Sequence, residues 1–215
     1  MIERKGMGLF SFFKKEKNVQ KFPSKRLQKV INNAITFLDK SPMHHLPLQE
    51  KFNGCGVYVL YYDGMFYDDL LKESCELYFA IHPIYVGKAV PTGWRNGRVS
   101  KKKISSNLWK RIQEHSNNIQ QASNLDIKDF CCKYVVLDDD LIVPVEAKLI
   151  RNYKSLWNAC IDGFGNHHPG VNRLNQTKSD WDTLHPGRAW AEKMSDLNTD
   201  RNQIITNVKR FMREK

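Results

Sequence analysis

The chain has 215 residues, of which 41% are hydrophobic and 11% aromatic, and its formal net charge is +11. That much apolar side chain can build a core, so wholesale disorder is excluded, and the length predicts one domain with additions. No run approaches the ~18 to 20 apolar residues of a membrane span, and a field of this sign favours phosphate polyanions such as DNA, RNA or an anionic membrane surface.

The cysteines and the positive charge narrow the class further. Five cysteines without a C-x-x-C pair predict neither a disulfide framework nor a zinc knuckle, and a reducing cytoplasm fits best. Residues 1–29 hold nine basic and two acidic side chains, and residues 86–115 hold eight basic and one acidic. Within the second stretch, glycines and Trp94 interleave with the charges, as expected of a loop that lies along a phosphate backbone.

The first half of the chain predicts one helix and two strands. The helix covers 24–40, with Ser24 as its cap. Residues 56–62 are β-branched or aromatic on both faces, which predicts a buried strand. Asp63-Gly64 then gives a hairpin turn signal, an acidic excursion of helical character follows, and 77–86 is expected as a second strand interrupted by a proline.

The second half predicts mostly helices. Residues 87–106 are expected to form a loop, and apolar spacing predicts helices over 107–120 and 145–157 with a third strand, 131–137, between them. The remaining elements are a loop over 162–173 and a helix near 200–213 capped by Thr199. The expected fold is α+β, a small antiparallel sheet of about three strands flanked by helices, with an N-terminal helix and a C-terminal helical extension.

Two tripeptides on the first two predicted strands carry a specific signal: Gly56-Val57-Tyr58 and Tyr85-Val86-Gly87. Polar residues follow them on later elements in the order Arg111, His115, Glu146 and Asn158. This order, over residues 54–160, resembles the GIY-YIG nuclease superfamily. Helical geometry independently places Arg111 and His115, four residues apart, on one side of an apolar stripe, where both can enter a cleft.

The resemblance implies hydrolysis of a DNA phosphodiester by water. Glu146, expected to open the helix after the third strand, would hold one divalent cation, expected to be Mg²⁺, and a single carboxylate argues against a two-metal site. Tyr58 would be the general base, with its pKa lowered by neighbouring positive charge from Lys88, Arg111 and the metal. His115 would take or relay the proton.

The resemblance implies further roles for residues around this centre. Arg111 would stabilise charge on the phosphate, and Tyr85 would orient the water or the phosphate. Asn158 would fix the backbone or the scissile region by hydrogen bonds. Lys88, which directly follows the second tripeptide, is a further catalytic candidate.

Departures from the family pattern point to one branch of it. The segments between the tripeptides and before the Arg111 helix are long, and His115 stands where many members have a tyrosine. These features resemble the type II restriction endonucleases, and residues 162–170 and 181–188 look like enzymes of that branch that cut the palindrome CCGCGG. A palindrome predicts a homodimer on double-stranded DNA, since one chain offers one catalytic constellation.

The expected organisation is a single domain with three regions. Residues 1–53 form a basic arm and a helix, residues 54–160 form the catalytic core with DNA-contacting insertions, and residues 161–215 form a recognition loop and C-terminal helices. Guanine N7 and O6 accept hydrogen bonds from basic side chains. The candidates for reading bases are Arg95, Arg98, Arg173, Arg188, His167 and His168. Consecutive lysines expected to contact phosphates are Lys101, Lys102 and Lys103.

Two other interpretations remain open from the sequence. Asp140, Glu146 and Lys148 resemble the D…E-x-K signature of the PD-(D/E)xK endonucleases, although that fold needs E-x-K on a strand and 145–157 has helical spacing. The non-enzymatic alternative is a basic nucleic-acid-binding module in which the tyrosines are structural.

Overall fold

The computed structural model describes residues 24–97, 105–167, 177–196 and 200–214. Within them, one antiparallel sheet has four strands in the order β1-β4-β2-β3. The strands are β1 (His44–His45), β2 (Gly56–Tyr62), β3 (Tyr85–Ala89) and β4 (Phe130–Val136). The α+β class is confirmed, and the strand beyond the expected three is β1, which has too few residues to leave a periodic pattern.

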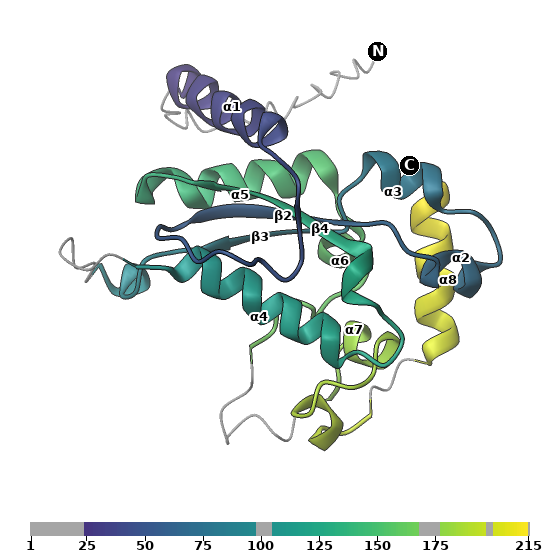
Figure 1. Ribbon diagram of the computed structural model, residues 1–215. Helices are drawn as coiled ribbons and strands as arrows, with labels where there is room; N and C mark the ends of the chain where they lie inside the picture. The colour runs from purple at the N-terminus through teal and green to yellow at the C-terminus, as the bar shows by residue number, and fades with distance from the viewer. Residues whose placement is uncertain (1–23, 98–104, 168–176, 197–199, 215) are drawn as a thin grey trace, which may run out of the picture.

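Helices cover both faces of this sheet (Figure 1). α1 (Lys25–Lys40) and α5 (Asp139–Tyr153) lie on one face and α4 (Asn107–Gln121) on the other. Val57 and Val59 of the central strand β2 belong to the core cluster of α1 and α5, whereas Tyr58 and Leu60 belong to the cluster of α4. A strand covered on both faces is apolar on both, which explains why 56–62 shows no alternation.

The connection from β2 to β3 holds two short helices, α2 (Phe66–Leu71) and α3 (Glu76–Ile81). The prediction of a hairpin at Asp63-Gly64 is therefore wrong, and so is that of one strand over 77–86, since β3 begins only at Tyr85. Aromatic composition favoured a strand, but the helix lets Phe79 pack edge-on against Tyr62, with ring centroids 5.1 Å apart. Tertiary packing outweighs local propensity here.

Strand β3 also continues into the expected loop, to Ala89, so Gly87 and Lys88 belong to the strand. α5 begins at Asp139, before the expected residue 145, and places Glu146 in the middle of the helix rather than at its start. Pro144 lies inside α5, where its missing N–H removes only one hydrogen bond near the N-terminal end of the helix. The acidic side chains in its first turn stabilise the helix by interacting with the positive end of its dipole.

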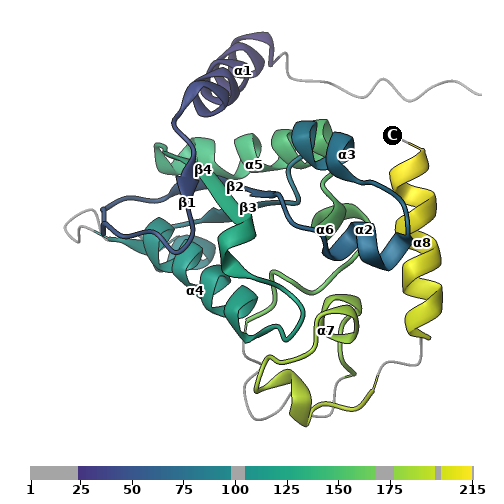
Figure 2. The same cartoon turned by 45° about the vertical axis from the view of Figure 1, so that its right-hand side comes forward.

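The remaining predicted elements agree to within a few residues, including β4 and the C-terminal helix α8 (Arg201–Arg213). α8 contacts α2 and α7 (Asp180–Leu184) at one end of the molecule (Figure 2). Asp200 caps α8 by accepting a hydrogen bond from the N–H of Asn202, so the cap is not Thr199, which lies outside the described residues. The shorter helices are α6 (Leu156–Ala159), η1 (Trp94–Asn96), η2 (Ile127–Asp129) and η4 (Ala191–Lys193).

None of the helices in the described part of the chain combines the length and the apolar character needed to cross a membrane.

Candidate active site

A hollow of about 450 Å³ opens at the β3 edge of the sheet. Residues from β2, β3, α4, α5 and two loops form its wall: Tyr58, Tyr85, Lys88, Ala89, Val90, Asn107, Lys110, Arg111, Glu114, Glu146, Gly165 and His167. Five of the seven predicted catalytic residues are therefore among its lining residues, and His115 and Asn158 lie directly behind them.

The position of β3 at an edge explains how side chains from opposite faces of the sheet meet. Tyr58 pairs with Gly87 in the β2–β3 ladder and Tyr85 pairs with Leu60, so both phenols lie on the α4 face. Lys88 pairs with Val57 and lies on the α5 face, where Glu146 is. Because β3 is the outermost strand of the sheet in the described residues, the hollow reaches around this edge and is lined from both faces.

Tyr58 and His115 form the buried centre of the site. The phenol oxygen of Tyr58 lies 2.5 Å from His115 Nε2, and both residues are 0% exposed. Burial raises the pKa of Tyr58 well above the usual phenol value and Tyr85 adds to this, while Arg111 lowers it by less. Arg111 thus acts on this pKa in the expected direction, but burial outweighs it and the net shift is upward.

His115 is held as the neutral imidazole. Burial lowers its pKa well below 6.5, and the positive charge of Arg111 adds to that effect. A neutral ring with hydrogen on Nδ1 can accept the Tyr58 proton at Nε2. Phe164 stacks on the imidazole, with centroids 4.4 Å apart, and Nδ1 has no hydrogen-bond partner in the described residues.

Arg111 faces the hollow from α4 and is fixed by three contacts. Nη2 donates to the carbonyl of Gly165 at 2.6 Å, and Nη1 donates to Glu114 Oε2 at 2.8 Å and lies 3.0 Å from His167 Nδ1. A Cβ at residue 165 would lie 2.6 Å from the Tyr85 hydroxyl, so glycine lets this loop approach the second phenol. The fork of Arg111 thus joins α4 to the loop around residue 165.

Lys88 and Glu146 form an ion pair between β3 and α5. The side chain of Glu146 is 13% exposed and opens into the hollow, where one carboxylate suits one hard cation whose remaining ligands are water and phosphate oxygens. No group of three or more His, Cys, Asp or Glu side chains gathers anywhere in the described ranges. Two carboxylates line the hollow, and since Glu114 accepts a hydrogen bond from Arg111, Glu146 is the candidate ligand for a divalent cation.

The same helix excludes the PD-(D/E)xK interpretation. Glu146 and Lys148 stand on α5 and not on a strand, so their side chains diverge by about 200° around the helix axis. Lys148 is absent from the residues that line the hollow, whereas Lys88 from β3 supplies the lysine next to Glu146.

Asn158 and Gly87 shape the second signature strand. The side-chain amide of Asn158 accepts from the N–H of Val86 at 2.7 Å and donates to its carbonyl at 2.9 Å. This agrees with the expected fixing of the backbone. A Cβ at Gly87 would lie 2.3 Å from the Tyr58 hydroxyl, so glycine in this tripeptide leaves room for the phenol of the first.

Arg188 is not where a base-reading residue would be. Its side chain is 0% exposed and its Nε donates to Asp182 Oδ1 at 2.6 Å. Its Cζ lies 4.5 Å from the ring centroids of both Trp181 and Trp190. Nη1 and Nη2 donate to the carbonyls of Phe164 and Gly163, so Arg188 braces the loop that covers His115.

Of the other residues predicted to contact DNA, two lie in the described part of the chain. His167 lies at the hollow beside Arg111, and Arg95 stands in η1. Outside the described residues lie Arg98, Lys101, Lys102, Lys103, His168 and Arg173.

Several residues of this site were not singled out as site residues by the sequence. Lys110 and Glu114 line the hollow on the same helix as Arg111, and their signal was the helical spacing from it. Phe164 and Gly165 reach the site through a loop, and neither spacing nor composition of a loop specifies such a contact.

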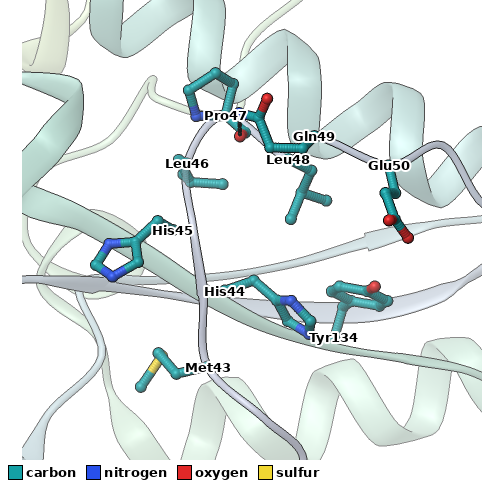
Figure 3. Close-up of a pocket in the computed structure, with 9 residues that line it drawn as sticks. All are labelled: Met43, His44, His45, Leu46, Pro47, Leu48, Gln49, Glu50 and Tyr134. Atoms are coloured by element: carbon teal, nitrogen blue, oxygen red, sulfur yellow. Dashed lines mark hydrogen bonds between the residues drawn. The ribbon is translucent and has the colours of Figure 1, made fainter.

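A further hollow, of about 430 Å³, lies at the opposite edge of the sheet around β1 (Figure 3). The rings of His44 and Tyr134 lie beside one another in its wall, with centroids 5.0 Å apart. None of the predicted catalytic residues lines it.

Comparison with known proteins agrees with this geometry. The family model described as the Eco29kI GIY-YIG domain matches residues 50–212. Because the match covers well over half of the chain, the protein belongs to this family of GIY-YIG type II restriction endonucleases. The family is one of restriction-type nucleases acting on DNA, and GIY-YIG nucleases generally depend on divalent metals. No curated protein matches the chain.

Proposed function

We propose that the protein is a type II restriction endonuclease that hydrolyses both strands of duplex DNA at a short GC-rich palindrome, with CCGCGG as the expected target. The observation that carries the proposal is the convergence of two phenols, a guanidinium, a lysine and a carboxylate on one hollow at the β3 edge. These groups together offer a proton acceptor, phosphate ligands and a metal ligand.

Tyr58 would accept the proton of the attacking water. An isolated phenol is a poor base, and burial makes this one poorer still. The neutral imidazole at 2.5 Å offers a second acceptor, because Tyr58 can pass its own proton to His115 Nε2 while it accepts one from water. Burial disfavours the imidazolium, so negative charge that develops on the phosphate would have to stabilise it. The products of this relay are a hydroxide at the phosphorus, a neutral phenol and an imidazolium.

Positively charged side chains would hold the scissile phosphate. Arg111 presents its fork at the wall shared with Gly165, and Lys110 and Lys88 line the same hollow. Fixed donors aimed at a phosphoryl oxygen stabilise the charge that develops there in the transition state. Tyr85, whose ring lies 6.2 Å from that of Tyr58, would orient the water or the phosphate.

Glu146 would hold the Mg²⁺ ion. When bound, the ion would supply charge for a non-bridging oxygen and for the leaving 3′ oxygen. Lys88 stands next to the carboxylate and would be free to turn toward the phosphate once a cation neutralises Glu146. Asn158 would act by holding Val86, and with it the β3 edge, in place.

Cleavage of both strands at a palindrome requires two hollows. One chain supplies one, so a two-fold homodimer on double-stranded DNA is the simplest assembly. The isologous geometry would present the same reading elements to each half-site.

Plasmid digestion tests this proposal. We expect supercoiled DNA to become linear when protein and Mg²⁺ are both present, and to remain intact when EDTA replaces the metal. A protein that shifts plasmid mobility without cutting, at any Mg²⁺ concentration, would instead be the basic binding module.

A further inference from the structure

A second hollow, of about 370 Å³, adjoins the candidate active site. The two share three residues, Arg111, Glu114 and His167, and the hydrogen bonds of Arg111 to the other two make this common wall one connected unit. The rest of the second hollow is formed by Asn117, Asn118, Gln121, Asn166 and Trp190. It is called the amide hollow below.

One stripe of α4 runs through both hollows. Arg111, Glu114, Asn118 and Gln121 follow the spacing i, i+3, i+7, i+10, which keeps side chains on one face of a helix. The rise per residue places Asn118 roughly 10 Å along the helix from Arg111. A ligand held at Arg111 and lying along α4 therefore reaches the amide hollow.

The chemistry of the amide hollow differs from that of a phosphate site. Phosphate oxygens only accept hydrogen bonds and favour Arg and Lys. Among the described residues no lysine lines the amide hollow, and its one arginine, Arg111, belongs to the wall shared with the candidate active site. The side-chain amides of Asn117, Asn118 and Asn166 make no hydrogen bond to any described residue. Amides donate and accept together, as the edges of bases do.

We propose that the amide hollow reads the edge of a nucleobase near the scissile phosphate, with Asn117 and Asn118 as specificity residues. This inference rests on the proposed DNA cleavage. Successive base pairs are about 3.4 Å apart along the duplex, so roughly 10 Å along α4 corresponds to about three steps. The base pair that is read lies within about three positions of the cut.

Sequence profiling of variants tests the inference. Asn117→Ala and Asn118→Ala, singly and together, remove the amides, and Gln120→Ala is the matched control, because Gln120 is exposed on the same helix but does not line the hollow. Each chain is given a pool of duplexes randomised over the target, and the cut ends are sequenced. A second selection measures the sequences bound by the same variants in a Glu146→Gln background.

The expected result is relaxed specificity at one base pair and its two-fold mate, with discrimination against the wrong base falling by about 5- to 150-fold. Gln120→Ala should keep the wild-type profile. An unchanged profile in the alanine variants would overturn the inference, and so would a uniform loss of binding at every sequence with a shallower salt dependence, which marks a phosphate contact.

Failure of the proposed function is separable from failure of this inference. A wild-type chain that cuts no DNA would remove the proposed function, while the binding selection would still report whether Asn117 and Asn118 change the preferred sequence. A wild-type chain that cuts one sequence, with variants that cut the same sequence as selectively, would remove only the inference.

Discussion

The phenol of Tyr58 and the imidazole of His115 share a hydrogen bond of 2.5 Å between two side chains with no exposed surface. Burial shifts their pKa values in opposite directions, upward for Tyr58 and downward for His115, so both groups are neutral near pH 7. In the proposed reaction the pair passes a proton from Tyr58 to His115. Burial thus outweighs the neighbouring positive charge that was expected to lower the pKa of Tyr58.

Removal of the Tyr58 hydroxyl should stop the reaction and spare DNA binding. General base catalysis contributes about 10²- to 10⁴-fold, so Tyr58→Phe should lower the single-turnover cleavage rate by at least ~100-fold with little change in Kd for DNA. Tyr61→Phe is the control, since Tyr61 lies on the same strand and packs with the α1–α5 cluster. Cleavage by Tyr58→Phe at the wild-type rate would remove Tyr58 from the proton path.

Glu146 and Lys148 stand two residues apart on α5 and should behave differently. Glu146→Gln removes the proposed Mg²⁺ ligand and should abolish metal-dependent cleavage, whereas Lys148→Ala should cut normally because Lys148 does not line the hollow. Cleavage assays across a range of Mg²⁺ concentrations check both. A loss in Lys148→Ala as large as that in Glu146→Gln would contradict the placement of the site.

Acid should destabilise the fold through its buried histidines. Burial lowers the pKa of His185 to about 3. Below about pH 6.5 the unfolded chain therefore binds a proton at His185 that the folded chain does not bind. The free energy of unfolding falls as the pH falls. Between pH 7 and pH 5 this single group should cost about 2 kcal/mol. Urea denaturation at the two pH values measures the effect.

A substitution separates His185 from the other acid-titrating groups. His185→Gln keeps an amide that can bond Tyr67 and Asn124, the present partners of the ring, but cannot titrate. Its free energy of unfolding should depend less on pH than that of the wild type, by about the same 2 kcal/mol. Equal pH dependence in the two proteins would show that His185 is protonated as readily folded as unfolded.

Arg188 should matter for stability and not for sequence choice. Arg188→Met leaves Asp182 buried without its partner, and breaking a buried pair in this way costs about 3 to 5 kcal/mol. Arg201→Met, an exposed arginine on α8, should cost less than about 0.5 kcal/mol. Denaturant unfolding of both variants checks this. A stable Arg188→Met variant with an altered DNA sequence preference would show that Arg188 contacts DNA.

Much of the fold could be predicted from the sequence because long helices have a strong apolar periodicity. The apolar spacing of 24–40 and 107–120 gave α1 and α4, and the doubly buried β2 lacks alternation for the reason expected. Segment 77–86 was misread, because a six-residue helix rich in aromatic side chains has the composition of a strand. Its conformation is decided by packing against Tyr62, which is distant in sequence.

The site residues that lie on helices and strands could be predicted from the sequence. The resemblance to GIY-YIG nucleases singled out Tyr58, Tyr85, Arg111 and Glu146 on strands and helices, and these four residues line one hollow. Arg188 was expected to read bases because arginine suits guanine N7 and O6. Its burial depends on Asp182 and two tryptophans coming together in three dimensions. The spacing of residues in the sequence does not predict that packing.

The central claim is that the hollow at the β3 edge cuts DNA, and sequencing of the ends produced from a plasmid tests it most directly. With Mg²⁺, the wild-type chain should give both strands cut at fixed positions within one palindrome, and Glu146→Gln, prepared in parallel, should leave the plasmid whole. Scattered ends, or identical fragments from the wild type and Glu146→Gln, would contradict the account.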